Sequence, residues 1–341
     1  MNSDMVDLTI SAAPHVRDKI KTPHLMRDVI IALLPATIGG LVIFGLRHTL
    51  GVIVVSVVSA VAAEYIGNVL FRRKNSIKDL SASVTGLLLA LILPPTSPYW
   101  MVVVGAFSAI LLGKAIFGSV GSNPFNPALV GRAVLMVSWT TFMTTWVKPF
   151  YWSGMGAMST ATMATVTGID AVTTATPLSI IKFQGLQPLL QMFGSRSQLY
   201  LALFLGNRPG CIGETSVLLL LIGGVYLILR KVIDWKIPLC FIGSVFILSF
   251  IFGRDPIFSI LSGGLFLGAF FMATDYSSSP LTSRGKLLYG IFLGFITVII
   301  RQFGPYPEGV MFSILLGNMV VPYFDKLRPH VYGVFKRKGE A

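Results

Sequence analysis

A cluster of hydroxyl groups stands in the sequence DAVTTATPLS, residues 170–179, within a chain that is otherwise mostly apolar. Three threonines fall within four positions, and the last of them, Thr176, is followed by Pro177. Threonine before proline is typical of a helix start, where the threonine caps the helix and the proline occupies its first turn. This explains Thr176 and Pro177 but gives no task to Asp170 or Thr173. The segment is therefore either a polar turn or a site for chemistry.

Polar side chains also interrupt the apolar segments. Glu64 lies within the apolar sequence AAEYIG, and a charge in a membrane is so costly that it must be paired, protonated or next to water. Other polar residues stand at breaks or ends of apolar segments: Asn123, Asn126, Arg132, Thr274, Asp275 and Glu308. Each could be structural, but their recurrence at matching points of the two halves is expected of broken helices around a central site. We expect that site to line an ion path or hold a cofactor, with Glu64 and Glu308 as the ion-path candidates.

The elements that must position these residues are membrane helices. Of the 341 residues, 54% are hydrophobic and 12% are charged, which is about half the charged share of a soluble protein. Residues 1–26 are polar and lack the apolar core of a signal peptide, so we expect the first apolar run to be an uncleaved span. A spanning helix needs about 20 apolar residues. Ten segments fit: 29–46, 51–71, 80–95, 99–117, 127–147, 214–230, 236–253, 257–274, 285–303 and 308–324.

The basic residues predict the orientation of these spans. Ten spans place both termini on one side of the membrane, together with 20 of the 27 Lys and Arg residues. The positive-inside rule makes that side cytoplasmic and puts the long loop 148–213 outside. The net charge of +13 then faces anionic lipid, and nucleic acid is not needed as a partner. Within the loop, PLSIIKFQGLQPLLQMF predicts either a helix along the membrane surface or a covered helix of a folded loop.

The order of the spans predicts two related halves. Short sequences such as IGG recur at offsets between 182 and 186 residues. Five spans in each half give the halves opposite orientations, as in many transporters. The predicted fold is an all-α integral membrane protein with about ten transmembrane helices in two inverted five-helix repeats. The segment 80–95 ends in two prolines, which predicts a half-helix that stops within the membrane. The expected divisions are an N-terminal segment (1–28), the first repeat (29–147), the loop (148–213), the second repeat (214–325) and a basic tail (326–341).

Several cofactor classes lack their ligands in this sequence. The two cysteines, Cys211 and Cys240, cannot supply the four thiolates of an iron–sulfur cluster. The four histidines show neither the helical pairing of a haem site nor the spacing of a zinc site. No G-x-G-x-x-G sequence follows a strand, so the chain has no NAD-binding fingerprint of its own.

Five motifs together resemble one family of membrane redox proteins. They are TGLLLALILPP (85–95), NPFNPALVGRA (123–133), GNRPGCIGETS (206–216), FMATDYSSSP (271–280) and YPEGVMFSILLGNMVVPYFD (306–325). In combination they are similar to the membrane subunit termed D (RnfD) of the Rnf complex, an ion-pumping ferredoxin:NAD oxidoreductase. They are similar, less closely, to the related membrane subunit, termed B, of the sodium-pumping NADH:quinone oxidoreductase, which usually has a longer N-terminus. The resemblance covers nearly all of residues 25–325.

The resemblance implies a function for the hydroxyl cluster. The pattern D-x-x-T-x-A-T is similar to the recognition sequence of flavin transferases, which attach FMN through its phosphate to the last threonine. This implies FMN esterified to Thr176, with Asp170 and Thr173 as recognition residues; a helix N-terminus favours the phosphate charge. The usual sequence has glycine where this chain has Thr174, whose branched side chain stiffens the loop. The central polar site would hold a second, non-covalent flavin (riboflavin) or line the ion path.

These observations predict a flavin-carrying electron-transfer subunit of an ion-translocating redox complex. It would lie in a prokaryotic cytoplasmic (inner) membrane, couple electron transfer to movement of Na⁺ or H⁺, and not be catalytic alone. FMN would supply the electron chemistry, while partner subunits would hold the iron–sulfur, NAD and ferredoxin sites and a flavin transferase would attach the FMN. The alternative is a small-solute channel or secondary transporter with an inverted-repeat fold. Such a protein has no use for D-x-x-T-x-A-T outside the membrane.

Overall fold

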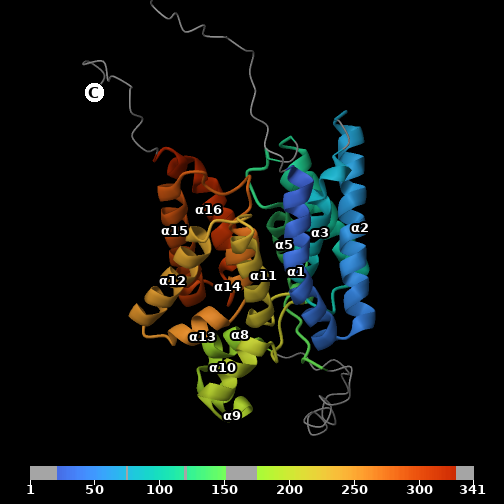
Figure 1. Ribbon diagram of the computed structural model, residues 1–341. Helices are drawn as coiled ribbons and strands as arrows, with labels where there is room; N and C mark the ends of the chain where they lie inside the picture. The colour runs from blue at the N-terminus through green and yellow to red at the C-terminus, as the bar shows by residue number, and fades with distance from the viewer. Residues whose placement is uncertain (1–20, 74–75, 119–120, 151–174, 328–341) are drawn as a thin grey trace, which may run out of the picture.

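The computed structural model describes residues 21–73, 76–118, 121–150 and 175–327, and its regular secondary structure is entirely helical (Figure 1). The all-α fold class is thus confirmed for these residues, whereas Asp170 and Thr173 lie outside them. The first half contains α1 (Thr22–Phe44), α2 (Leu46–Leu70), η1 (Ile77–Asp79), α3 (Ser81–Leu91), α4 (Tyr99–Ile110), η2 (Leu111–Ala115), α5 (Pro127–Ser138) and α6 (Thr140–Met143). The remainder contains α8 (Pro177–Gln184), α9 (Gln187–Phe193), α10 (Arg196–Leu205), α11 (Val217–Leu229), α12 (Lys236–Ile251), α13 (Pro256–Leu261), α14 (Leu265–Leu267), η5 (Gly268–Met272), α15 (Ser283–Phe303) and α16 (Val310–Asp325).

The apolar composition of the helices is consistent with a membrane protein. Among the described residues, α1, α2 and α15 are long and apolar enough to cross a membrane. Six shorter apolar helices accompany them: α3, α4 with η2, α5, α11, α12 and α16. Each lies within one of the ten predicted spans, except that α16 extends one residue beyond its span, to Asp325. The remaining predicted span, 257–274, is broken into α13, α14 and η5. Large apolar side chains project from α2, including Val54, Val58 and Val69, and suit contact with lipid.

The predicted half-helix is α3, which has 11 residues and is therefore about 16 Å long. Its residues from Leu87 to Leu91 are all buried, as expected of a helix surrounded by protein. A helix end leaves backbone carbonyls without partners. Here Gly213 N donates to Leu91 O at 2.8 Å, and Ile212 N donates to Leu93 O at 3.1 Å. The loop that precedes α11 therefore completes the end of α3 inside the bundle.

Two helix contacts of the first predicted repeat have counterparts in the second. In the first half, α4 packs against α2 and α5; in the second, α15 packs against α12 and α16. Contacts between α1 and α11 join the halves. In each half the backbone also widens into a π-helical turn, η2 after α4 and η5 after α14. Such turns are frequent at functional sites.

A small helical unit formed by α8, α9 and α10 lies at one end of the bundle, at the bottom of the view in Figure 1 and next to α13. Ile180 and Leu189 are buried in its own core, together with Leu199, Leu203 and Phe258 of α13. Gly185, with φ of +83°, separates α8 from α9. Residues 177–193 thus form two short helices that share a small core with α10 and α13, while Phe183 and Met192 remain exposed. The position of these helices along a membrane surface stays a prediction.

Candidate functional site

Thr176 is the N-cap of α8, as the sequence predicts. Its backbone is extended, and its Oγ1 accepts a hydrogen bond from Ser179 N at 3.3 Å. The same hydroxyl lies 3.1 Å from Ser179 Oγ. Pro177 occupies the first position of the helix and is buried. Thr176 itself is half-buried, so its hydroxyl stands at the edge of the folded unit.

Lys182 fixes the helix that begins at Thr176. Its Nζ donates to Gly304 O at 2.5 Å and to Tyr306 O at 2.9 Å, beyond the C-terminal end of α15. Carbonyls at a helix C-terminus attract a cation. Burial, and then the charge of Arg254, lower the pKa of Lys182. The position of α8 therefore depends directly on the second half of the bundle.

A cavity of about 450 Å³, which we call the Thr176 cavity, opens beside this cap. Its volume is in the range of small-molecule sites. Four aromatic side chains contribute to its wall: Trp146, Phe183, Tyr306 and Phe312. The rings of Tyr306 and Phe312 stack with centroids 5.5 Å apart. The wall thus offers flat apolar faces next to a helix N-terminus.

Arg132 and Glu308 meet at the wall of this cavity, although 176 positions separate them in the sequence. Arg132 Nη2 lies 2.9 Å from Glu308 Oε2. Glu308 Oε1 accepts a second hydrogen bond from Gly264 N at 2.7 Å. Arg132 comes from α5 and Glu308 from the segment before α16, so this ion pair links the two halves at the cavity.

Two further charged residues in this cavity, Arg208 and Glu214, were not among the predicted site residues. Arg208 donates to the backbone oxygens of Glu214 at 2.5 Å, Thr215 at 3.0 Å and Gly263 at 3.2 Å. Glu214 Oε1 accepts from Cys211 N at 3.2 Å. Both side chains are buried. The available signal was the motif GNRPGCIGETS, which places an arginine before an apolar span and a glutamate at its start.

Arg301 lies close behind these residues and was also missed, because it stands near the end of a long apolar helix. It donates to Ser259 O at 2.6 Å and to Ser262 O at 3.1 Å. These carbonyls end α13, where the chain breaks before Gly263 at φ of +69°. Arg301 therefore supports the break in the eighth predicted span.

A second cavity of about 300 Å³ lies elsewhere in the bundle and reaches the beginning of α1. Asp275 is its acidic group, and Asp275 Oδ2 accepts from Ser278 at 3.0 Å, Ser277 at 3.1 Å and Asn123 at 3.4 Å. Asn126 caps α5, and its amide donates to Met272 O at 3.2 Å, which joins α5 to η5. Four predicted site residues therefore line one cavity: Asn123, Asn126, Thr274 and Asp275. Arg132, which was predicted with them, faces the Thr176 cavity instead, because it lies more than one helical turn further along α5.

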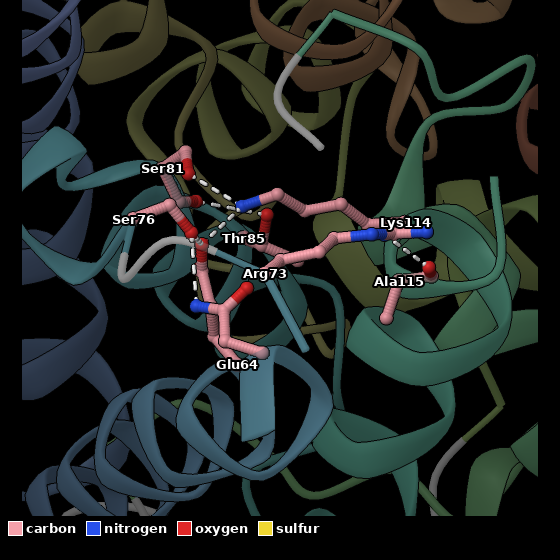
Figure 2. A network of polar contacts seen from close by, with 8 residues as sticks. Glu64, Arg73, Ser76, Ser81, Thr85, Lys114 and Ala115 are labelled. Atoms are coloured by element: carbon pink, nitrogen blue, oxygen red, sulfur yellow. Dashed lines mark hydrogen bonds and ion pairs between the residues drawn. The ribbon is translucent and has the colours of Figure 1, made fainter. Parts of the chain in front are cut away.

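Glu64 is paired, one of the three states expected for a charge in a membrane. Its Oε1 lies 2.7 Å from Lys114 Nζ of η2 and accepts a hydrogen bond from Ser76 (Figure 2). Lys114 Nζ also donates to Ser81 Oγ at 2.7 Å. Glu64 is in the last third of α2 and lines neither cavity, but Lys114 and Ser81 line the second one. The π-helical turn thus places a lysine between the second cavity and Glu64.

The sequence matches the profile of the NQR2, RnfD, RnfE family over residues 9–333. The chain belongs to this family. The predicted resemblance to RnfD is confirmed by family relatives of nearly the same length. The chain is 46% identical over 325 residues, 93% of each chain, to the subunit termed D of the proton-translocating ferredoxin:NAD(+) oxidoreductase complex of Clostridium ljungdahlii. It is 43% identical over 340 residues, 98% of each chain, to the subunit termed D of the Na(+)-translocating ferredoxin:NAD(+) oxidoreductase complex of Acetobacterium woodii.

A third family relative is the subunit termed D of the ion-translocating oxidoreductase complex of Escherichia fergusonii. It is 36% identical over 364 aligned positions, which cover 97% of this chain and 99% of the relative. All three relatives are named as subunits of redox complexes. The solute channel or secondary transporter considered as an alternative finds no support among them.

Proposed function

We propose that this chain, as the RnfD subunit of an ion-translocating ferredoxin:NAD(+) oxidoreductase complex, carries FMN as a phosphoester on Thr176. The observation that carries the proposal is that one hydroxyl both caps α8 and borders the 450 Å³ cavity. A phosphate on Oγ1 would lie at the N-terminus of α8, where the helix dipole favours negative charge. A ring system attached there is within reach of the cavity. Asp170 and Thr173, outside the described residues, are the proposed recognition residues for the flavin transferase.

The residues around the cavity fit a flavin. Aromatic rings such as Phe183 and Phe312 offer flat surfaces for a planar ring system. Arg132 and Arg208 place buried positive charge at the cavity, which stabilises negative charge on an occupant. When bound, FMN supplies the electron transfer, and the protein orients and insulates it. Other subunits hold the iron–sulfur, NAD and ferredoxin sites, and the complex moves Na⁺ or H⁺.

Flavin fluorescence on a denaturing gel tests the attachment after co-expression with a flavin transferase. Thr176→Ala should abolish the fluorescent band, and Thr176→Ser should retain part of it, because a hydroxyl remains. Thr174→Ala is the matched control and should leave the band nearly unchanged. Loss of the cap costs about 1 kcal/mol, so the Thr176→Ala protein should still fold and elute as wild type in size-exclusion chromatography. A fluorescent band from Thr176→Ala would move the assignment to Thr173 or Thr174.

We further propose that the second cavity holds a non-covalent flavin such as riboflavin, with Asn123, Asn126, Thr274 and Asp275 as polar contacts. Its volume of about 300 Å³ and its mixed apolar and polar wall support this role. Acid precipitation releases a non-covalent flavin into the supernatant but leaves a phosphoester-linked one on the protein. Asp275→Asn should lower the released flavin without changing the covalent band. If acid releases no flavin from wild type, these residues instead belong to the ion path with Glu64 and Glu308.

For the membrane arrangement we propose two inverted five-helix repeats, residues 29–147 and 214–325, with both termini cytoplasmic and loop 148–213 outside. The equivalent packing of α2, α4 and α5 in one half and α12, α15 and α16 in the other supports the repeat. The excess of Lys and Arg on the terminal side supports the orientation.

A further inference from the structure

One carboxylate in the Thr176 cavity has an unused oxygen. Glu214 is 5% exposed and lines the cavity. Its Oε1 accepts from Cys211 N, whereas Oε2 has no hydrogen-bond partner among the described residues. A buried carboxylate oxygen without a partner is costly when charged, and a proton on it lowers that cost. Burial therefore favours the protonated form of Glu214.

A second carboxylate reinforces this preference. A Cβ built on Gly264 would lie 2.4 Å from Glu214 Oε2 and 3.0 Å from Glu308 Oε1, so both oxygens converge on the space that this glycine leaves free. Like charges this close disfavour ionisation of both groups. Glu308 is satisfied by Arg132 and by Gly264 N. If one of the two carboxylates binds a proton, it is therefore Glu214.

Three arginines oppose this preference. Arg132, Arg208 and Arg301 come from α5, from the loop before α11 and from α15, and all three are buried. Arg208 and Arg301 donate to backbone carbonyls, and neither forms an ion pair in the described part of the chain. Three arginines against two glutamates leave the cluster positive, which disfavours a bound cation and favours an ionised Glu214. The thiol of Cys211, which lies 3.6 Å from Arg132, is the remaining titratable group of the cluster.

Burial and Glu308 favour the protonated form of Glu214, whereas the arginines favour the ionised form. A negative charge added to the cavity shifts this balance toward the protonated form. We propose that Glu214 binds a proton when an electron enters this cavity and releases it when the electron leaves. The inference rests on the proposed attachment of FMN at Thr176. When the redox complex delivers an electron, ionised Glu214 takes one proton from a hydronium ion at the cavity mouth. One O–H bond of hydronium breaks, one O–H bond forms at Oε2, and a water molecule is left. The bond at Oε2 breaks as the electron leaves, and the proton returns to water, so charge and atoms balance over the cycle.

Spectroelectrochemical titration of the flavin between pH 6 and 8 tests this role, using full-length protein matured with a flavin transferase. The signal of the covalent flavin is taken as the difference from Thr176→Ala protein. If one proton is bound for each electron, the ratio of reduced to oxidised flavin at a fixed potential falls about tenfold per pH unit. This corresponds to a change of about 59 mV per pH unit in the reduction potential of the flavin. We expect the reduction potential of the covalent flavin to depend on pH more steeply in wild type than in Glu214→Gln. The covalent band should be intact in both proteins.

Two matched variants complete the test. Asp79→Asn also removes a carboxylate, but Asp79 lies in η1 and lines neither cavity, so it should keep the wild-type dependence. Glu214→Asp should keep a dependence displaced along the pH axis, and it serves if Glu214→Gln does not fold. Equal dependences in wild type, Glu214→Gln and Glu214→Asp overturn the inference while leaving the attachment at Thr176 standing. Absence of a covalent band in wild type overturns both.

Discussion

Breaking the buried ion pair between Glu64 and Lys114 should destabilise the bundle far more than breaking a half-exposed pair. Side-chain exposures are 3% for Glu64 and 6% for Lys114. Lys114→Met leaves the Glu64 carboxylate buried with Ser76 as its hydrogen-bond donor, while Glu64 Oε2 already has no partner in the described residues. Removing one partner of a buried pair costs about 3–5 kcal/mol. We expect a loss of that size in the free energy of unfolding.

The double variant measures the interaction energy between Glu64 and Lys114. Glu64→Gln combined with Lys114→Met removes both charges, so no charge is left buried without a partner. Replacing both partners of a buried pair is often close to neutral. The loss in the double variant should therefore be at least about 2 kcal/mol smaller than the sum of the two single losses, which is a coupling within the range of contacting residues.

Unfolding in mixed micelles with increasing SDS, followed by tryptophan fluorescence, measures these free energies. Lys286→Met is the matched control, because Lys286 lies 3.2 Å from Asp234 but the two side chains are 24% and 28% exposed. Such a pair contributes about 0.2–1 kcal/mol. Single losses below about 1 kcal/mol for Lys114→Met, additive with Glu64→Gln, would refute the reasoning from burial.

Three other outcomes are expected. Glu64→Gln should slow ion-coupled turnover in the assembled complex while the bound flavin stays unchanged; normal pumping would reduce Glu64 to a structural residue. Gly264→Ala should lower the free energy of unfolding by about 1–3 kcal/mol in the same titration, because its Cβ would lie 2.4 Å from Glu214 Oε2. Gly243→Ala is the control: a Cβ there would have nothing within 4 Å, so the change should be neutral or stabilising. In a cysteine-free background, a cysteine replacing Thr160 should react with an impermeant reagent in whole cells and one replacing Asn75 should not; the reverse pattern would invert the topology.

Local features of the sequence were sufficient to predict most of the apolar helices, the N-cap at Thr176 and the family. Apolar runs of suitable length predicted segments that overlap α1, α2 and α15, although each of these helices begins before its predicted span, because a bilayer imposes the same requirement on each helix separately. Two prolines predicted the short α3, and Thr176 before Pro177 predicted the start of α8. These features depend on residues that are neighbours in the chain. Motif combinations predicted the family for the same reason, since each motif is read without knowing what it contacts.

The grouping of the polar residues was decided by the tertiary structure. Asn126 and Arg132 belong to one motif and one helix, yet they face different cavities, and Arg132 pairs with Glu308 from the other half. Sequence spacing fixes positions along a helix, but the neighbours of a buried polar group depend on how separate helices pack. Glu214 was missed for this reason. Its surroundings, three arginines and a second carboxylate, come together at the Thr176 cavity only when the two halves pack.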